Sequence, residues 1–185
     1  FLPSGNIKIS KNIGVRPVLD KNLKFLLAIG VIVFTSFAMV QSVTAYYLQD
    51  KFLLTLNETA KSTAIALGSM AAMSIVSQLT IVQRFKGSPL RLIAWSIPVF
   101  ILSALVISLS YDFTGVLVGM SLMGLGMGLA TPGYTAAASL NADPNNQGAA
   151  VGMSMVAPGI GFALGPLLSG FLYQANLIFP FLFTI

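Results

Sequence analysis

Residues 25–48 read FLLAIGVIVFTSFAMVQSVTAYYL, a run of 24 positions without a charged side chain. A helix needs about 20 apolar residues to cross a hydrocarbon core of roughly 30 Å. The run is therefore long enough to span a membrane with some tilt. It predicts that this chain is an integral membrane protein.

The composition of the whole chain supports this prediction. Of 185 residues, 56% are hydrophobic and 8% are charged, and the mean hydropathy is +0.86. Soluble domains carry about 25% charged residues, so this chain has too little polar surface to solvate a globule. The composition excludes a soluble domain, a disordered chain and a nucleic-acid binder.

Further uncharged stretches follow the first one along the chain. Polar and turn-forming clusters separate them, such as the run DPNN at residues 143–146. We predict an all-α membrane protein with spans at about 25–48, 62–83, 92–110, 113–140 and 147–173, and a truncated sixth span at 177–185.

Both ends of the chain are abrupt. It opens at Phe1 and not at Met, and the nine residues from Leu177 onward reach only about 14 Å as a helix. A helix that stopped there would leave backbone carbonyls without partners in lipid. We therefore expect a fragment in which residues 1–24 are a cytoplasmic linker and residues 25–185 form the transmembrane bundle.

Basic residues lie mostly on one side of this topology. Residues 1–24 and the connection between the second and third spans hold 8 of the 10 Lys and Arg residues, and that connection contributes Arg84, Lys86 and Arg91. Cytoplasmic loops carry an excess of Lys and Arg. We expect the N-terminus in the cytoplasm and the protein in a bacterial inner membrane, with the net charge of +5 serving mainly as a topology signal.

The predicted spans contain no ionisable side chain in their interiors. Asp, Glu, Lys, Arg and His are costly at mid-membrane, and those that persist usually carry protons or ions. The chain has no Cys and no His, so it lacks the commonest thiolate and imidazole ligands and bases. We expect no enzyme activity, no metal and no cofactor in these residues.

Small residues recur at spacings that allow membrane helices to approach closely. The second span has a four-residue ladder, the fourth has both four-residue and seven-residue glycine spacings, and the fifth has a four-residue series. In that order, the members are Ala60, Ala64, Gly68 and Ala72; Gly124 and Gly128; Gly119, Gly126 and Gly133; and Gly161, Gly165 and Ser169. The spacings predict a tightly packed bundle.

Two helix faces are candidates to line a solute cavity, because their members share one side of a helix at 100° per residue. On the first span these are Phe34, Phe37, Gln41 and Thr44, and on the fourth they are Met120, Met123, Met127 and Tyr134. Flexible Met side chains suit a surface that accepts varied ligands, although plain packing or lipid contact would also explain them. A Gln facing lipid would be costly, so Gln41 is expected to face protein or a cavity.

One ten-residue motif carries a family resemblance. Residues 161–170 read GFALGPLLSG, which resembles the G-x-x-x-G-P-x-x-G-G signature of drug:proton antiporters in the major facilitator superfamily, with Ser169 in place of one Gly. Pro166 removes a backbone hydrogen bond and kinks the helix, while the glycines, including Gly161, Gly165 and Gly170, permit close packing there.

Three further segments agree with this resemblance. Gln147-Gly148 is similar to the entry of the eleventh helix of such transporters, and residues 124–133, GLGMGLATPG, to their glycine-rich tenth helix. Residues 83–91, QRFKGSPLR, resemble the second-half copy of the D-R-x-G-R-R loop. There Gln83 replaces the acidic residue and Leu79 replaces the leading Gly.

The resemblance implies the C-terminal six-helix half of a twelve-helix fold, with the last helix truncated. It also implies alternating access, in which two halves rock about a central cavity. The implied partners are the lipid bilayer, the missing N-terminal half, a small-molecule substrate and protons. The titrating residues of such antiporters commonly lie in the N-terminal half.

The leading hypothesis is therefore a proton-coupled exporter of small amphipathic compounds. One alternative is a non-transporting membrane protein that packs with a partner through its small-residue faces. Another is a half-size carrier that works as a homodimer.

Overall fold

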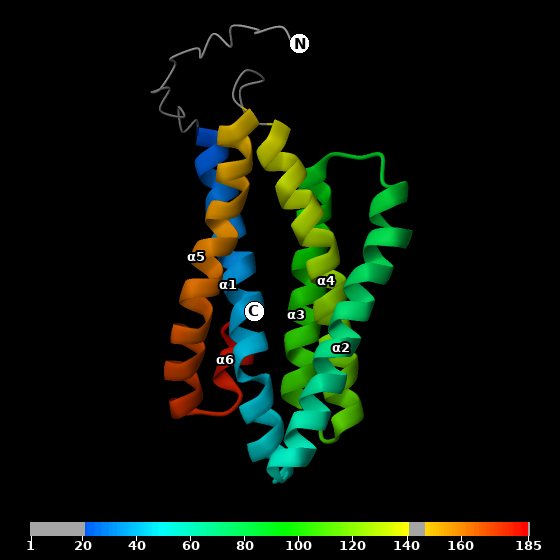
Figure 1. Ribbon diagram of the computed structural model, residues 1–185, viewed down its shortest axis with the longest axis vertical. Helices are drawn as coiled ribbons and strands as arrows, with labels where there is room; N and C mark the ends of the chain where they lie inside the picture. The colour runs from blue at the N-terminus through cyan, green and yellow to red at the C-terminus, as the bar shows by residue number, and fades with distance from the viewer. Residues whose placement is uncertain (1–20, 141–146, 185) are drawn as a thin grey trace, which may run out of the picture.

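The computed structural model describes residues 21–140 and 147–184. These residues form helices and contain no strand (Figure 1). The helices are α1 (Lys21–Phe52), α2 (Leu56–Thr80), the 3₁₀ turn η1 (Val82–Arg84), α3 (Pro89–Leu109), α4 (Phe113–Leu140), α5 (Gln147–Ala175) and α6 (Phe179–Leu182). Five of the described helices are long and apolar enough to cross a membrane, which confirms the predicted all-α membrane fold.

The connection between α1 and α2 is much shorter than the predicted polar segment. Helix α1 continues through Asp50 and Lys51, and α2 begins at Leu56. A capping box starts α2, because the Thr55 backbone N–H donates to the Glu58 carboxylate at 2.9 Å and the Glu58 N–H points back to Thr55 Oγ1 at 3.5 Å. Charged side chains near a helix end reach water, so the cap and not the first charge sets the boundary.

The sixth helix is also shorter than predicted. The described helix covers only Phe179–Leu182, because Asn176 Oδ1 accepts a hydrogen bond from the Ile178 N–H at 2.9 Å and holds a turn just before it. Its Phe181 is buried and packs against Tyr47 of α1, with the two ring centroids 4.6 Å apart. This short segment therefore anchors the C-terminal end against α1.

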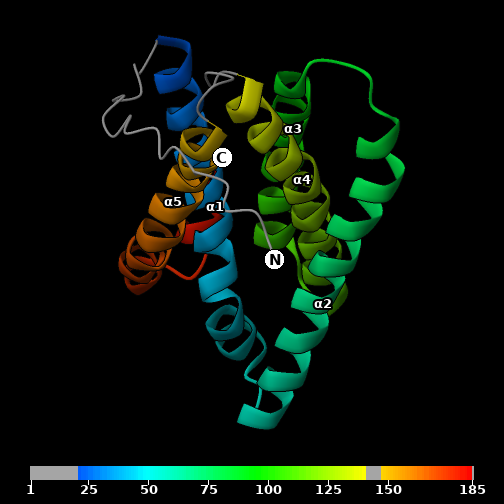
Figure 2. The same cartoon turned by 45° about the horizontal axis from the view of Figure 1, so that its top comes forward.

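The helices fall into two groups that both views separate (Figures 1 and 2). Helices α1, α5 and α6 form one group, and α2, α3 and α4 form the other. Within the groups, α1 runs parallel to α5 and α2 runs parallel to α4. The main apolar core joins the groups where α1 meets α4, through residues such as Phe37, Val40, Met120 and Met123.

Helix α4 presents two separate glycine faces to its neighbours, as the two spacings predicted. Methyl groups at Gly124 and Gly128 would collide with the α2 backbone at Met70 and with Ser77. The seven-residue series faces α3 instead, where a methyl group at Gly126 would lie 3.2 Å from the Phe100 ring. Gly119 and Gly133 also face α3, and the Ser103 hydroxyl donates to the Gly119 carbonyl at 2.7 Å.

The small-residue ladder of α2 does not pack as predicted. Ala60, Ala64, Gly68 and Ala72 are all exposed, and a methyl group at Gly68 would meet no described atom within 4 Å. Helix α2 turns its opposite face, which carries Met70 and Ser77, toward α4. Spacing shows which face could approach another helix, whereas among the described helices the position of α4 decides which face does.

The different surroundings of Gly124 and Gly68 predict different effects of an alanine substitution on stability. We expect Gly124→Ala to destabilise the fold by roughly 1–3 kcal/mol, as overpacked cores generally do. That corresponds to a lower unfolding midpoint by about 2–4 °C per kcal/mol in a chain of this size. The midpoint is read from Trp95 fluorescence in detergent.

Gly68→Ala is the matched control, since its methyl group meets open space and Ala favours a helix more than Gly does. Its midpoint should be unchanged or higher. Equal midpoints for the two variants would contradict the close α2–α4 contact.

Candidate functional site

The most regular contact in the bundle is the line along which α1 and α5 meet, here called the α1–α5 seam. Three of its contacts pair an α1 residue with the α5 residue 127 positions later. Gly161 lies on Phe34, Gly165 on Ala38, and the hydroxyls of Ser42 and Ser169 are 2.8 Å apart. A constant offset at four-residue steps means that both helices contribute i±4 ridges to a parallel contact.

The glycines of the seam are required for this approach. A methyl group at Gly161 would lie 2.6 Å from Phe34 Cβ, and one at Gly165 would lie 2.5 Å from Ala38 Cβ. Cβ atoms in real structures are essentially never this close to another heavy atom. A side chain at either position would therefore push the two helices apart. The described buried face of α5 consists of small residues only, namely Ser154, Ala157, Gly161, Gly165 and Ser169.

The remaining members of the predicted motif have different environments. Ser169, which stands where the family signature has Gly, is 1% exposed, and its hydroxyl donates to the Pro166 carbonyl at 3.1 Å. Pro166 itself is exposed, and its ring deprives the Phe162 carbonyl of its helical partner. Gly170 is exposed, and no described atom lies near its Cβ position. The motif thus combines a buried packing stripe with a weakened, exposed helix face.

The two predicted cavity faces meet each other where α1 contacts α4. The Phe34 and Tyr134 rings pack edge to face with centroids 5.6 Å apart. The Thr44 hydroxyl donates to the Val40 carbonyl at 2.7 Å and lies 3.9 Å from Met120 Sδ. Six of the eight predicted residues are buried in this contact: Phe34, Phe37, Thr44, Met120, Met123 and Tyr134.

Gln41 and Met127 are the two predicted cavity residues that keep partial exposure. Because Phe34 lies opposite Tyr134 and Thr44 lies opposite Met120, the antiparallel register puts Gln41 level with residues 123–127. The Gln41 amide makes no hydrogen bond to any other residue in the described part of the chain. It is a polar group at mid-bundle that can still bind a solute.

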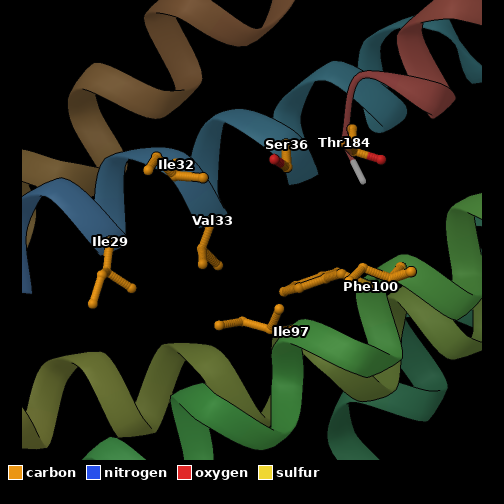
Figure 3. Close-up of a pocket in the computed structure, with 8 residues that line it drawn as sticks. Ile29, Ile32, Val33, Ser36, Ile97, Phe100 and Thr184 are labelled. Carbon is orange, nitrogen blue, oxygen red and sulfur yellow. The ribbon is translucent and has the colours of Figure 1, made fainter.

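A pocket of about 180 Å³ lies between α1 and α3, and sequence reasoning did not find it (Figure 3). Figure 3 shows Ile29 and Val33 of α1 opposite Ile97 and Phe100 of α3, with Thr184 at the end near α6. Its lining is almost entirely aliphatic and aromatic, with the Ser36 and Thr184 hydroxyls as polar groups. Such a lining gives no pattern in the sequence that differs from ordinary core residues.

A second hollow of about 330 Å³ lies beside the α1–α5 seam, toward the end where α1 finishes. Its lining is Ser42, Val43, Tyr46, Pro166, Ser169, Gly170, Tyr173 and Gln174. We call it the tyrosine groove. The signal that could have revealed it is the seam's own offset, because Tyr46 and Tyr173 are again 127 positions apart.

The basic connection between α2 and α3 lies at the same end of the bundle as the start of α1 (Figure 1). Arg84, Lys86 and Arg91 are all exposed there. The Phe85 ring packs against the Trp95 ring with centroids 5.2 Å apart, which fixes the connection on α3. These three charges are therefore held at one surface of the bundle.

The described residues offer no arrangement of His, Cys, Asp and Glu that could hold a metal ion. In that part of the chain, the ionisable side chains are confined to helix ends and connections. A bundle of membrane-length helices, closely packed through glycine and with a neutral interior, is the architecture of an integral membrane protein.

Comparison with known families identifies the superfamily. The family model of the Major Facilitator Superfamily matches residues 25–185. The chain therefore belongs to the Major Facilitator Superfamily, a family of membrane transporters and not of enzymes. No curated protein matches the chain.

The seam makes a direct prediction about transport. Gly165→Leu should separate α1 from α5, because its side chain has no space beside Ala38. We expect transport to fall to background while the amount of protein in the membrane fraction stays close to that of the wild type. Uptake or efflux by membrane vesicles, together with immunoblotting, measures both quantities.

Gly159→Leu on the same helix is the matched control, since Gly159 is exposed and no described atom lies near its Cβ position. It should transport normally. Normal transport by Gly165→Leu would eliminate the functional role of the seam.

Proposed function

We propose that this chain is the C-terminal six-helix half of a secondary transporter that exports small amphipathic compounds in exchange for protons. The observation that carries the proposal is the α1–α5 seam, where the Gly-Pro motif of α5 packs its glycines directly on the α1 backbone. The proposed setting is a bacterial inner membrane with the N-terminus in the cytoplasm.

The uncovered faces of α2 and α5 support an N-terminal half as partner. These two helices are the least buried of the five membrane-length helices. In the most apolar stretch of each, only 17% of α2 and 22% of α5 is buried. The α2 face carries the small-residue ladder around Gly68, and the α5 face carries Phe162, Leu167 and Phe171. In alternating access, surfaces of this kind slide or part as two halves rock about a central site.

The proposed substrate contacts are centred on Gln41 and Met127. An amide that lacks a partner can donate to or accept from a polar group of the solute, and a thioether adapts its shape to an apolar group. Phe34, Phe37, Thr44, Met120, Met123 and Tyr134 lie behind them and would hold them in position. In this proposal the six buried residues reach the substrate only if α1 and α4 separate.

Proton coupling is proposed to use residues outside the described helices. In the described part of the chain, no ionisable side chain occupies a helix interior. The coupling site is then expected in the other half, and this half would contribute neutral substrate contacts.

Proton coupling can be tested with the full-length protein in proteoliposomes that hold an amphipathic fluorescent dye. We expect an imposed proton gradient to accelerate dye movement and a protonophore to abolish that acceleration, because antiport draws its energy from the gradient. The readout is dye fluorescence over time. A rate of dye movement that the protonophore leaves unchanged would refute proton coupling. No dye movement at all would favour a packing or scaffold protein.

The cavity assignment predicts a change in selectivity. Gln41→Leu should shift the relative rates for several substrates by more than it changes protein abundance, because it removes a polar contact without altering the packing stripe. The rate for each compound is compared with that of Gln78→Leu, which alters a Gln at an exposed position on α2. An identical substrate profile for the two variants would exclude Gln41 from the cavity.

A further inference from the structure

The tyrosine groove is joined to a carboxylate at its edge. The Tyr173 hydroxyl, which belongs to the groove lining, donates to Asp50 Oδ2 at 2.6 Å. The Tyr46 ring stands beside the Tyr173 ring, with centroids 6.3 Å apart and planes inclined by 53°. Two inclined aromatic faces therefore lie at one end of a hollow of about 330 Å³, and a carboxylate lies one hydrogen bond beyond its lining.

The Asp50 carboxylate has no cation of its own. Its neighbour Lys51 turns to the other side of α1, where its Nζ donates to the Tyr47 hydroxyl at 2.5 Å and lies 4.8 Å from the Tyr47 ring centroid. No ion pair to Asp50 occurs in the described part of the chain. One of its two oxygens is engaged by Tyr173, so acceptor capacity remains for a further donor or charge.

The aromatic rings are accessible to a ligand. Tyr46 is 62% exposed, although it is a large ring at the border of the seam. A cation within about 6 Å of an aromatic face is attracted by the ring quadrupole. Carboxylate and rings together favour an organic ammonium ion over a neutral molecule or an anion.

The other end of the groove is suited to an apolar group. Val43, Pro166 and Gly170 line it, and the paired hydroxyls of Ser42 and Ser169 lie at the seam. The neighbouring α5 side chains Leu167 and Phe171 are exposed and apolar. The groove thus changes from polar at Asp50 to apolar near the middle of α5.

From this arrangement we infer that the tyrosine groove is a binding site for the alkylammonium group of an amphipathic cation. Asp50 pairs with the charge, Tyr46 and Tyr173 pack against the alkyl groups on nitrogen, and the apolar part lies along α5. The site is separate from the Gln41 position and does not depend on transport. A soluble cation and a lipid headgroup that carries an ammonium group both present this chemistry.

The test is direct binding to the full-length protein in detergent micelles. The probe is benzyltrimethylammonium, observed by saturation-transfer NMR and titrated for affinity, with uncharged neopentylbenzene as its isosteric control. We expect the cation to bind and the neutral compound to bind much more weakly. Asp50→Asn should weaken cation binding about fivefold, which is the upper range for an exposed ion pair.

Asp50→Asn keeps an oxygen that can accept the Tyr173 hydrogen bond, so the variant should fold normally. Asp112→Asn is the matched control, because Asp112 is an exposed carboxylate in the connection between α3 and α4 at the same end of the bundle. It removes the same charge and should leave binding unchanged. Tyr46→Leu should weaken binding, whereas Tyr46→Phe, which keeps the ring, should not.

Two vesicle compositions distinguish the source of the ligand. In each vesicle, the loss of probe binding on Asp50→Asn is measured, because accumulation of the cation at the anionic phosphatidylglycerol surface cancels in that comparison. A smaller loss in phosphatidylethanolamine than in phosphatidylglycerol would show that a lipid headgroup occupies the groove, whereas equal losses would assign it to soluble cations. Equal affinity of the wild type and Asp50→Asn, or equal binding of the charged and neutral probes, would overturn the proposal. Loss of transport with intact probe binding would count against the transporter proposal alone.

Discussion

The backbone contact between α1 and α5 is the interaction on which the rest of the structure depends. In lipid, helices gain no hydrophobic energy by associating, so they must approach closely enough for dispersion contacts. Gly161 and Gly165 permit that approach, and Ser42 and Ser169 add a hydroxyl pair to the same contact. Helix α1 also carries the face that meets α4, so it links the α5 contact to the second group of helices.

Glycines four residues apart bring two different pairs of helices into close contact. Gly124 and Gly128 bring α2 onto α4 in a parallel pair, as Gly161 and Gly165 bring α5 onto α1. The antiparallel α3–α4 pair instead uses glycines seven residues apart, which suits the coiled-coil-like packing of i±3 and i±4 ridges. Helices α1 and α4 are therefore the two helices on which the others pack, and the predicted cavity residues lie where α1 and α4 contact each other.

The distribution of charge divides the molecule by depth. At one end of the bundle, Arg84, Lys86 and Arg91 are exposed, and at the other, Asp50 and Lys51 project from the last turn of α1 to opposite sides. Between these ends the described helices offer only neutral side chains, among them the Gln41 amide and the buried Thr35 hydroxyl, which have no hydrogen-bond partner in the described part of the chain. In the function proposed above, the solute meets shape and single polar groups at mid-depth, and charge only at the surfaces of the bundle.

The sequence by itself determined the class of the protein, because charge-free stretches of membrane length admit only helices in lipid. It also identified the motif around Gly165, which forms the α5 side of the α1–α5 seam. That motif resembles one found in the major facilitator superfamily. The helix limits near Asp50 were missed, since a capping box at Thr55 outweighs nearby charges. Only the tertiary structure decided which small-residue series are contacts: the series of α5 is buried and that of α2 around Gly68 is exposed, despite identical spacing. Spacing sets how closely a helix can be approached, but the positions of all the other helices determine which face a neighbour covers.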